Sequence, residues 1–142
     1  MKTHLNLSTR DLLASVAFYR TLLNTEPAKH FDDYALFLTE SPGLELALSL
    51  DRNTRAGSDV HYGIAVDTPG LVQNAMERLK GAGLEADIES GECCYAVQDK
   101  VWATDPDGRR WETYYVIAET GERETGTTCC GEAGEEAACC SA

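Results

Sequence analysis

The chain has 142 residues, a hydrophobic fraction of 43% and a formal net charge of -12 at pH 7. This size fits one domain with a real core, and an acidic surface repels phosphate backbones, so we expect no nucleic-acid partner. No apolar run is long enough to cross a bilayer, and residues 1–6 lack the apolar core of a secretory signal. We therefore expect a soluble, cytoplasmic protein with no membrane partner.

The first half of the chain, about residues 1–52, predicts a module with one helix and several strands. Apolar residues alternate in the opening segment, which favours a strand, and then recur at helical spacing. The module has the order βαβββ if a further short strand precedes Tyr34. Its predicted elements are a strand that opens at His4, a helix over 11–23 with Thr9 as candidate start, and strands over 34–38 and 44–50.

The second half, about residues 58–118, repeats this order of elements after a polar linker at 51–59. An internal duplication is the simplest explanation. We therefore expect an α+β domain over residues 1–118, in which two tandem βαβββ modules form a curved sheet around one site. The second set of predicted elements is a strand that opens at His61, a helix over 71–79 with Thr68 as candidate start, and strands over 94–97, 101–104 and 111–117.

The last segment, residues 119–142, differs from both modules. It holds six glutamates and one arginine and no large apolar residue, so it cannot bury enough surface to offset the entropy of ordering. We expect a disordered, acidic, cysteine-rich tail. Its four cysteines form two adjacent pairs, Cys129 with Cys130 and Cys139 with Cys140.

All six cysteines of the chain are paired in this way, and the remaining pair is Cys93 with Cys94. A bridge between neighbours closes a strained ring and constrains little of the unfolded chain, so reduced thiols are expected. Paired thiolates favour trivalent arsenic, cadmium and mercury. Adjacent residues of a strand point to opposite faces, so both thiols can hold one ion only where the backbone departs from regular strand geometry, and Gly91 makes that plausible.

The duplication also predicts metal ligands by position. His4 and His61 each open the first strand of a module. Aligning the turn glycines Gly43 and Gly108 sets Glu112 opposite Ala47, so the carboxylate has no counterpart in the first module. Two histidines and one carboxylate form the facial set of non-haem ferrous oxygenases, which leaves positions free for oxygen and substrate; a hydrolytic metal centre is the other chemistry this set allows.

Two further residues compete for a place in this site. His30 lies in a charged segment that reads as a loop or a short edge strand, and we assign it to solvent or to the rim of the pocket. Glu45 shares a face with Ala47 and Ser49 if no bulge intervenes, which makes it an outside candidate for a fourth ligand. The two modules of one chain could form the pocket without a partner subunit, and composition leaves the oligomeric state open.

These modules, with His4, His61 and Glu112, resemble the vicinal oxygen chelate superfamily, which includes glyoxalase I and extradiol dioxygenases. The resemblance spans roughly residues 1–118. Within the superfamily, the chain is most similar to the organoarsenical carbon-arsenic lyase and cadmium-induced protein family. The segments that carry this similarity are Phe18-Tyr19, residues 26–29, Tyr34, residues 93–102 and Trp111-Glu112.

That resemblance implies an enzyme dependent on ferrous iron and dioxygen that cleaves the carbon-arsenic bond of trivalent organoarsenicals and releases arsenite, which gives resistance to them. Cys93 and Cys94 would hold arsenic, and the triad would hold Fe(II), although Ni, Co, Zn or Mn could occupy the same site. The tail thiols would be accessory. Members of the family often have glutamine at the first ligand position, where this chain has His4, a stronger ligand for borderline divalent metals.

Two other functions stay open at this point. One is non-enzymatic binding of cadmium or arsenite, in which the three cysteine pairs provide capacity and the histidines are structural. The other is a glyoxalase-like metalloenzyme, either an isomerase or a thiol transferase that acts on an antibiotic, but neither reaction needs adjacent thiols at 93 and 94. A shared fold alone does not decide between them.

Overall fold

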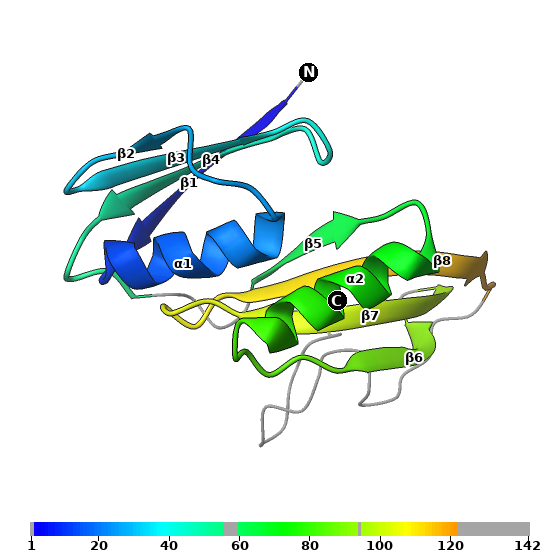
Figure 1. Cartoon of the computed structure of the whole chain (residues 1–142). Coiled ribbons are helices and arrows are strands. Elements are labelled where there is room, and N and C mark those ends of the chain that lie inside the picture. Colours follow the sequence, from blue (N-terminus) through cyan, green and yellow to red (C-terminus); the bar gives the residue numbers. More distant parts are fainter. Residues whose placement is uncertain (1, 56–59, 94, 122–142) are drawn as a thin grey trace.

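The computed structural model describes residues 2–55, 60–93 and 95–121. It confirms the α+β class with two tandem βαβββ modules, each with one helix against a four-stranded sheet (Figure 1). The elements of the first module are β1 Thr3–Thr9, α1 Leu12–Leu23, β2 Lys29–His30, β3 Tyr34–Thr39 and β4 Leu44–Leu50. Those of the second are β5 His61–Ala65, α2 Pro69–Gly81, β6 Ile88–Cys93, β7 Ala96–Thr104 and β8 Arg110–Glu119.

Both sheets have the same topology, which is the structural signature of the duplication. The strand orders are β1-β4-β3-β2 and β5-β8-β7-β6, so that the first strand of each module lies at a sheet edge, parallel to the last strand. The register also repeats. Ala47 pairs with the residue two beyond His4, and Glu112 pairs with the residue two beyond His61. The equivalence of Ala47 and Glu112 inferred from the turn glycines is therefore confirmed.

Alternating apolar residues place the core between each sheet and its helix. In β4 the side chains of Leu44, Leu46 and Leu48 are all buried on the helix side. The other face of each sheet carries the polar side chains of the candidate site. This division leaves one face of both sheets free for chemistry.

The start of α1 differs from the sequence prediction. Thr9 is the last residue of β1, and its hydroxyl lies 2.6 Å from that of buried Ser15. Asp11 caps the helix instead, since its side chain accepts a hydrogen bond from the Ala14 amide at 3.0 Å. Thr68 is the N-cap residue of α2, as predicted.

The strands between residues 88 and 104 also differ. Residues 96–97 of the first predicted strand and the whole predicted strand 101–104 belong to one strand, β7, and a strand that the sequence did not predict, β6, precedes it. The polar residues 98–100 read as a break, but they continue the strand with a register shift between Val97 and Gln98. β6 has no apolar alternation, and its pairing with β7 makes it a strand.

A buried polar network joins the two modules. The fully buried Tyr19 of α1 donates from its hydroxyl to Asp105 Oδ2 at 2.8 Å and accepts from Trp111 Nε1 at 3.2 Å. Arg109 donates to the same carboxylate oxygen at 3.1 Å and to the Ser8 carbonyl at 2.6 Å. The turn before β8 is therefore tied to the end of β1 and to α1.

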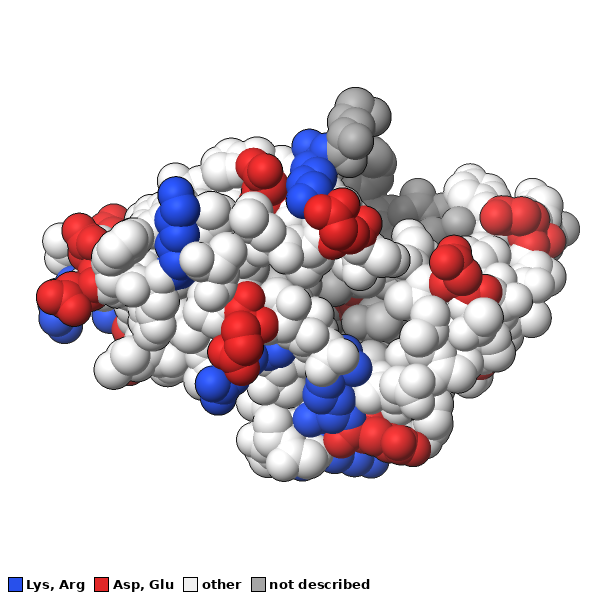
Figure 2. Space-filling view, turned by 45° about the horizontal axis from the view of Figure 1, so that its top comes forward, with Lys and Arg blue, Asp and Glu red and all other residues white. Residues whose placement is uncertain are grey.

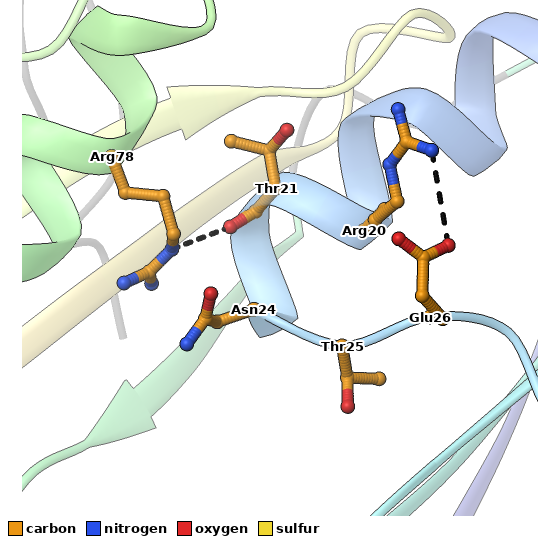
Figure 3. A pocket seen from close by; sticks show the side chains of 6 residues that line it. All are labelled: Arg20, Thr21, Asn24, Thr25, Glu26 and Arg78. Atoms are coloured by element: carbon orange, nitrogen blue, oxygen red, sulfur yellow. Dashed lines mark hydrogen bonds and ion pairs between the residues drawn. The ribbon is translucent and has the colours of Figure 1, made fainter.

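A second contact joins the helices, at a hollow of about 320 Å³ (Figure 3). Arg78 of α2 donates to the Thr21 carbonyl at 2.7 Å and to the Leu22 carbonyl at 3.1 Å, so that two carbonyls in the last turn of α1 accept hydrogen bonds from α2. Arg20 forms an ion pair with Glu26 at 3.8 Å on the other side of this hollow. No predicted site residue lines it.

The surface view shows acidic and basic side chains interspersed over both modules (Figure 2). On the face in view they form no extended patch of one sign. Within the described part of the chain, neither helix has the length and apolar character that a membrane span requires.

Candidate metal centre

His61 and Glu112 form the core of the candidate site. His61 opens edge strand β5, and Glu112 lies on the adjacent β8. Their Nε2 and Oε1 atoms are 3.7 Å apart, with the imidazole 46% exposed and the carboxylate 14% exposed. The pair is reached from solvent on the histidine side.

A glycine allows this approach. Gly63 lies directly opposite Glu112 in the parallel pair β5–β8. A Cβ atom at Gly63 would lie 3.1 Å from Glu112 Oε1 and 3.0 Å from Tyr114 Cε1. Because a Cβ contact this short requires the neighbours to shift, only glycine leaves the carboxylate its present position. No sequence pattern indicates this role, because only the strand register places Gly63 opposite Glu112.

The charges around Glu112 act in both directions. Burial raises the pKa of its carboxyl group above the usual value, while Lys100, His61 and Arg110 lower it and Glu89 raises it further. The net direction is upward. A cation bound beside the carboxylate would favour the ionised form, so the site has the electrostatic character of one completed by a positive ligand.

Trp102 organises the side chains next to this pair. Its ring meets the His61 ring edge-on at 5.4 Å between centroids, and its Nε1–H donates to Glu89 Oε2 at 3.1 Å. The Arg110 guanidinium lies 4.1 Å from the indole centroid. Lys100 lies on the same strand, is only 4% exposed, and approaches the indole at 5.6 Å. These neighbours of His61 were not predicted from the sequence, although Gln98, Lys100 and Trp102 alternate along β7.

His4 lies on edge strand β1, in the other module. Its Nδ1 is 3.7 Å from Glu45 Oε2, and both side chains are partly exposed, at 58% and 44%. Among the described residues, no group of three histidine, cysteine, aspartate or glutamate side chains is positioned to share a metal ion. One chain thus brings His61 to Glu112 and His4 to Glu45, and it does not bring His4 to the other two predicted ligands.

The other predicted site residues are His30 and the six cysteines, and the structure describes only some of them. His30 lies on the short edge strand β2, and it lines a separate hollow of about 340 Å³ with Leu12, Leu13, Phe31 and Asp32. The backbone of Cys93 ends β6 and pairs with Ala96. Tyr95, with a φ of 67°, is the turn residue directly before β7. Cys94, Cys129, Cys130, Cys139 and Cys140 lie outside the described residues.

The donors present fit a divalent metal ion. An imidazole nitrogen and a carboxylate oxygen each bind such ions at about 2.0–2.2 Å, and the 3.7 Å between His61 Nε2 and Glu112 Oε1 lies within the span of two such bonds. Nitrogen and oxygen donors suit Fe, Mn, Co, Ni and Zn. The pair could supply two ligands to such an ion.

Comparison with known proteins gives consistent matches over nearly the whole chain. The sequence profile of the Glyoxalase/Bleomycin resistance protein/Dioxygenase superfamily matches residues 3–113. A trivalent organoarsenical cleaving enzyme from Bacillus sp. strain MD1 is 39% identical over 97% of this chain and 89% of its own length. A cadmium-induced protein from Mycobacterium bovis is also 39% identical, over 98% and 92% of the two chains.

Solved structures give the same fold. A glyoxalase/bleomycin resistance protein/dioxygenase from Alicyclobacillus acidocaldarius superposes with a TM-score of 0.68 at 22% identity, and the match covers 83% of this chain and 92% of that one. At this identity the match supports the architecture only.

Proposed function

This chain belongs to the glyoxalase/bleomycin resistance protein/dioxygenase superfamily, and from that premise we propose that it cleaves the carbon-arsenic bond of trivalent organoarsenicals and releases arsenite. The side chains of His61 and Glu112 carry the proposal, because they lie 3.7 Å apart on neighbouring strands, close enough to bind one metal ion together. Relatives named for organoarsenical cleavage, at 39% identity over 97% of the chain, point to the substrate class.

The proposed roles follow from donor chemistry. His61, Glu112 and His4 would hold Fe(II), which when bound supplies a site for reaction with dioxygen next to the substrate. Cys93 and Cys94 would hold the arsenic atom, since paired thiolates are strong ligands of trivalent arsenic. Trp102 packs against His61 and limits the orientations of its ring. Arsenic and metal held close together would make the attack on the attached carbon a local event.

Within one chain, His4 does not share a site with His61 and Glu112. We propose that the His4 of a second copy of the chain completes the site. Edge strands leave backbone groups free to pair with another chain, and β1 and β5 are both edge strands. The buried contacts of Arg109 hold the end of β1 against the turn before β8, which opposes a closure of β1 onto β5 within one chain. A two-fold dimer would form two equivalent sites, each with His4 from one copy and the other two ligands from its partner.

The first experiment measures arsenite release. The reduced, full-length protein is loaded anaerobically with ferrous iron, mixed with trivalent methylarsenite and then exposed to oxygen, and arsenic species are separated by chromatography with elemental detection. We expect release that requires both iron and oxygen. Turnover should fall at least about a hundredfold in Cys93→Ser, Cys94→Ser, His61→Ala and Glu112→Ala, because each removes a proposed ligand of arsenic or metal.

Other outcomes of this experiment are equally informative. Tight cadmium or arsenite binding without release would assign the protein to sequestration, and capacity would then fall when residues after Ala118 are removed. Full turnover in both cysteine variants would refute the proposal that Cys93 and Cys94 bind arsenic. If the protein is a lyase, we expect removal of the tail, residues 119–142, to leave turnover largely unchanged.

A further inference from the structure

His4 and Glu45 form a pair that the proposed ligand set does not use. They lie directly opposite each other in the parallel strands β1 and β4. Their closest atoms, His4 Nδ1 and Glu45 Oε2, are 3.7 Å apart. Glu45 therefore approaches the ring nitrogen nearest the backbone and leaves Nε2 pointing away from it.

The equivalent position in the second module is occupied differently. Glu45 corresponds in register to Arg110, which pairs with His61, while Glu112 approaches His61 from the residue two further along β8. There the carboxylate lies 3.7 Å from Nε2 of the histidine. The two histidine–carboxylate pairs thus have different geometry: one carboxylate is beside Nε2, where a shared ion would bind, and the other is beside Nδ1.

A carboxylate at Nδ1 has a well-defined effect on a metal-binding histidine. Such histidines usually donate the hydrogen of the free ring nitrogen to a carboxylate or carbonyl, which fixes the tautomer and ring orientation and makes the ligating nitrogen a better donor. Glu45 stands where it can accept this hydrogen after a shift of less than about 1 Å towards normal hydrogen-bond length.

We infer that Glu45 is the positioning residue of His4, which holds the ring with a hydrogen on Nδ1 so that Nε2 serves as the metal ligand. This inference rests on the proposed function in one respect, because it takes His4 to be a ligand. It also explains how an exposed histidine on an edge strand becomes an oriented ligand.

The test is a double-mutant cycle on metal affinity, with Co(II) as the probe. Binding is measured by titration calorimetry and by the visible absorption of the bound ion, on the full-length, reduced protein without arsenical. Glu45→Ala should weaken Co(II) binding roughly tenfold and change the absorption spectrum. Glu45→Gln, which can still accept a hydrogen bond, should lose less.

The same substitution in a His4→Ala background decides the mechanism, because alanine has no polar side-chain atom that Glu45 could position. We expect Glu45→Ala to have no further effect there, because no Nδ1 hydrogen remains to be held. A matched control is Glu40→Ala, which removes another exposed carboxylate of the first module and its 2.6 Å contact with Lys2 without touching His4. Its Co(II) affinity should equal that of the wild type.

Three results would overturn the inference. Equal Co(II) affinity in Glu45→Ala and wild type, with binding still weakened by His4→Ala, would remove the role of Glu45 alone. An undiminished loss in the His4→Ala background would make Glu45 a direct ligand. Wild-type affinity in His4→Ala itself would exclude His4 from the metal site, and would refute both the proposed ligand set and the role of Glu45.

Discussion

Glu112 reaches the space beside His61 because the residue opposite it has no side chain. The carboxylate is mostly buried, and burial raises its pKa, so its position is costly for the metal-free protein. Lys100 and Arg110 partly offset this cost by lowering the pKa. The position and charge of the candidate ligand Glu112 therefore depend on three neighbours: Gly63 leaves room for the carboxylate, and Lys100 and Arg110 favour its ionised form.

Gly63→Ala tests that arrangement. The new Cβ would meet Glu112 Oε1 and Tyr114 Cε1 at 3.1 and 3.0 Å, so the carboxylate must move. We expect Co(II) affinity to fall roughly tenfold, or ~1.4 kcal/mol, as measured by titration calorimetry. Gly91→Ala on β6 of the same sheet is the control, because a Cβ there meets nothing within 4 Å. Equal affinities in the two variants would show that the protein accommodates the new Cβ at position 63 without moving the Glu112 carboxylate, and would contradict this prediction.

The turn before β8 has a structural role beyond its own module. Asp107 accepts a hydrogen bond from Arg10 Nε at 2.9 Å, across the module boundary. Burial alone would raise the pKa of Asp107, but hydrogen bonds from Thr9 and Arg10 outweigh it, and the net shift is downward. A carboxyl group with a lowered pKa stabilises the fold at pH values above its unfolded pKa. That stability is lost as the pH falls through its folded pKa.

Asp107→Asn should reveal this contribution. We expect the free energy of unfolding at pH 7 to fall by about 1–3 kcal/mol, and the loss of stability below about pH 4 to be shallower than in the wild type. Chemical denaturation between pH 3 and 7 measures both quantities. Asp87→Asn is the control, because its 2.6 Å pair with Lys80 is on the surface and contributes little. A parallel pH profile in Asp107→Asn would contradict the assignment.

At the scale of the whole molecule, the two modules are held together by buried contacts, yet their candidate ligands lie apart. Tyr19, Asp105 and Arg109 join α1 to the turn before β8. His4 and His61 occupy two different edge strands. The proposed site shared between two copies would bring the three proposed ligands together without a rearrangement of the two modules.

Mixing two inactive variants tests the shared site. His4→Ala and His61→Ala should each be inactive alone. After they are combined and allowed to exchange subunits, half of the dimers are hybrids with one intact site, so arsenite release should recover to about one quarter of wild type. Analytical ultracentrifugation checks the dimer directly. A monomeric protein that is fully active would refute the assembly while leaving the proposed reaction intact.

The repeated βαβββ order and the equivalence of Ala47 and Glu112 could be predicted from the sequence. Both follow from local alternation, helical spacing and turn residues, which short segments encode. The sequence did not predict β6 or the continuity of β7, because polar residues such as Gln98 and Lys100 acquire their place only by pairing with neighbouring strands. Three contacts required the folded chain: Gly63 faces Glu112, Trp102 packs on His61, and His4 lies beside Glu45. These are contacts between strands distant in sequence, and their register is fixed by the packed sheet and not by any one segment.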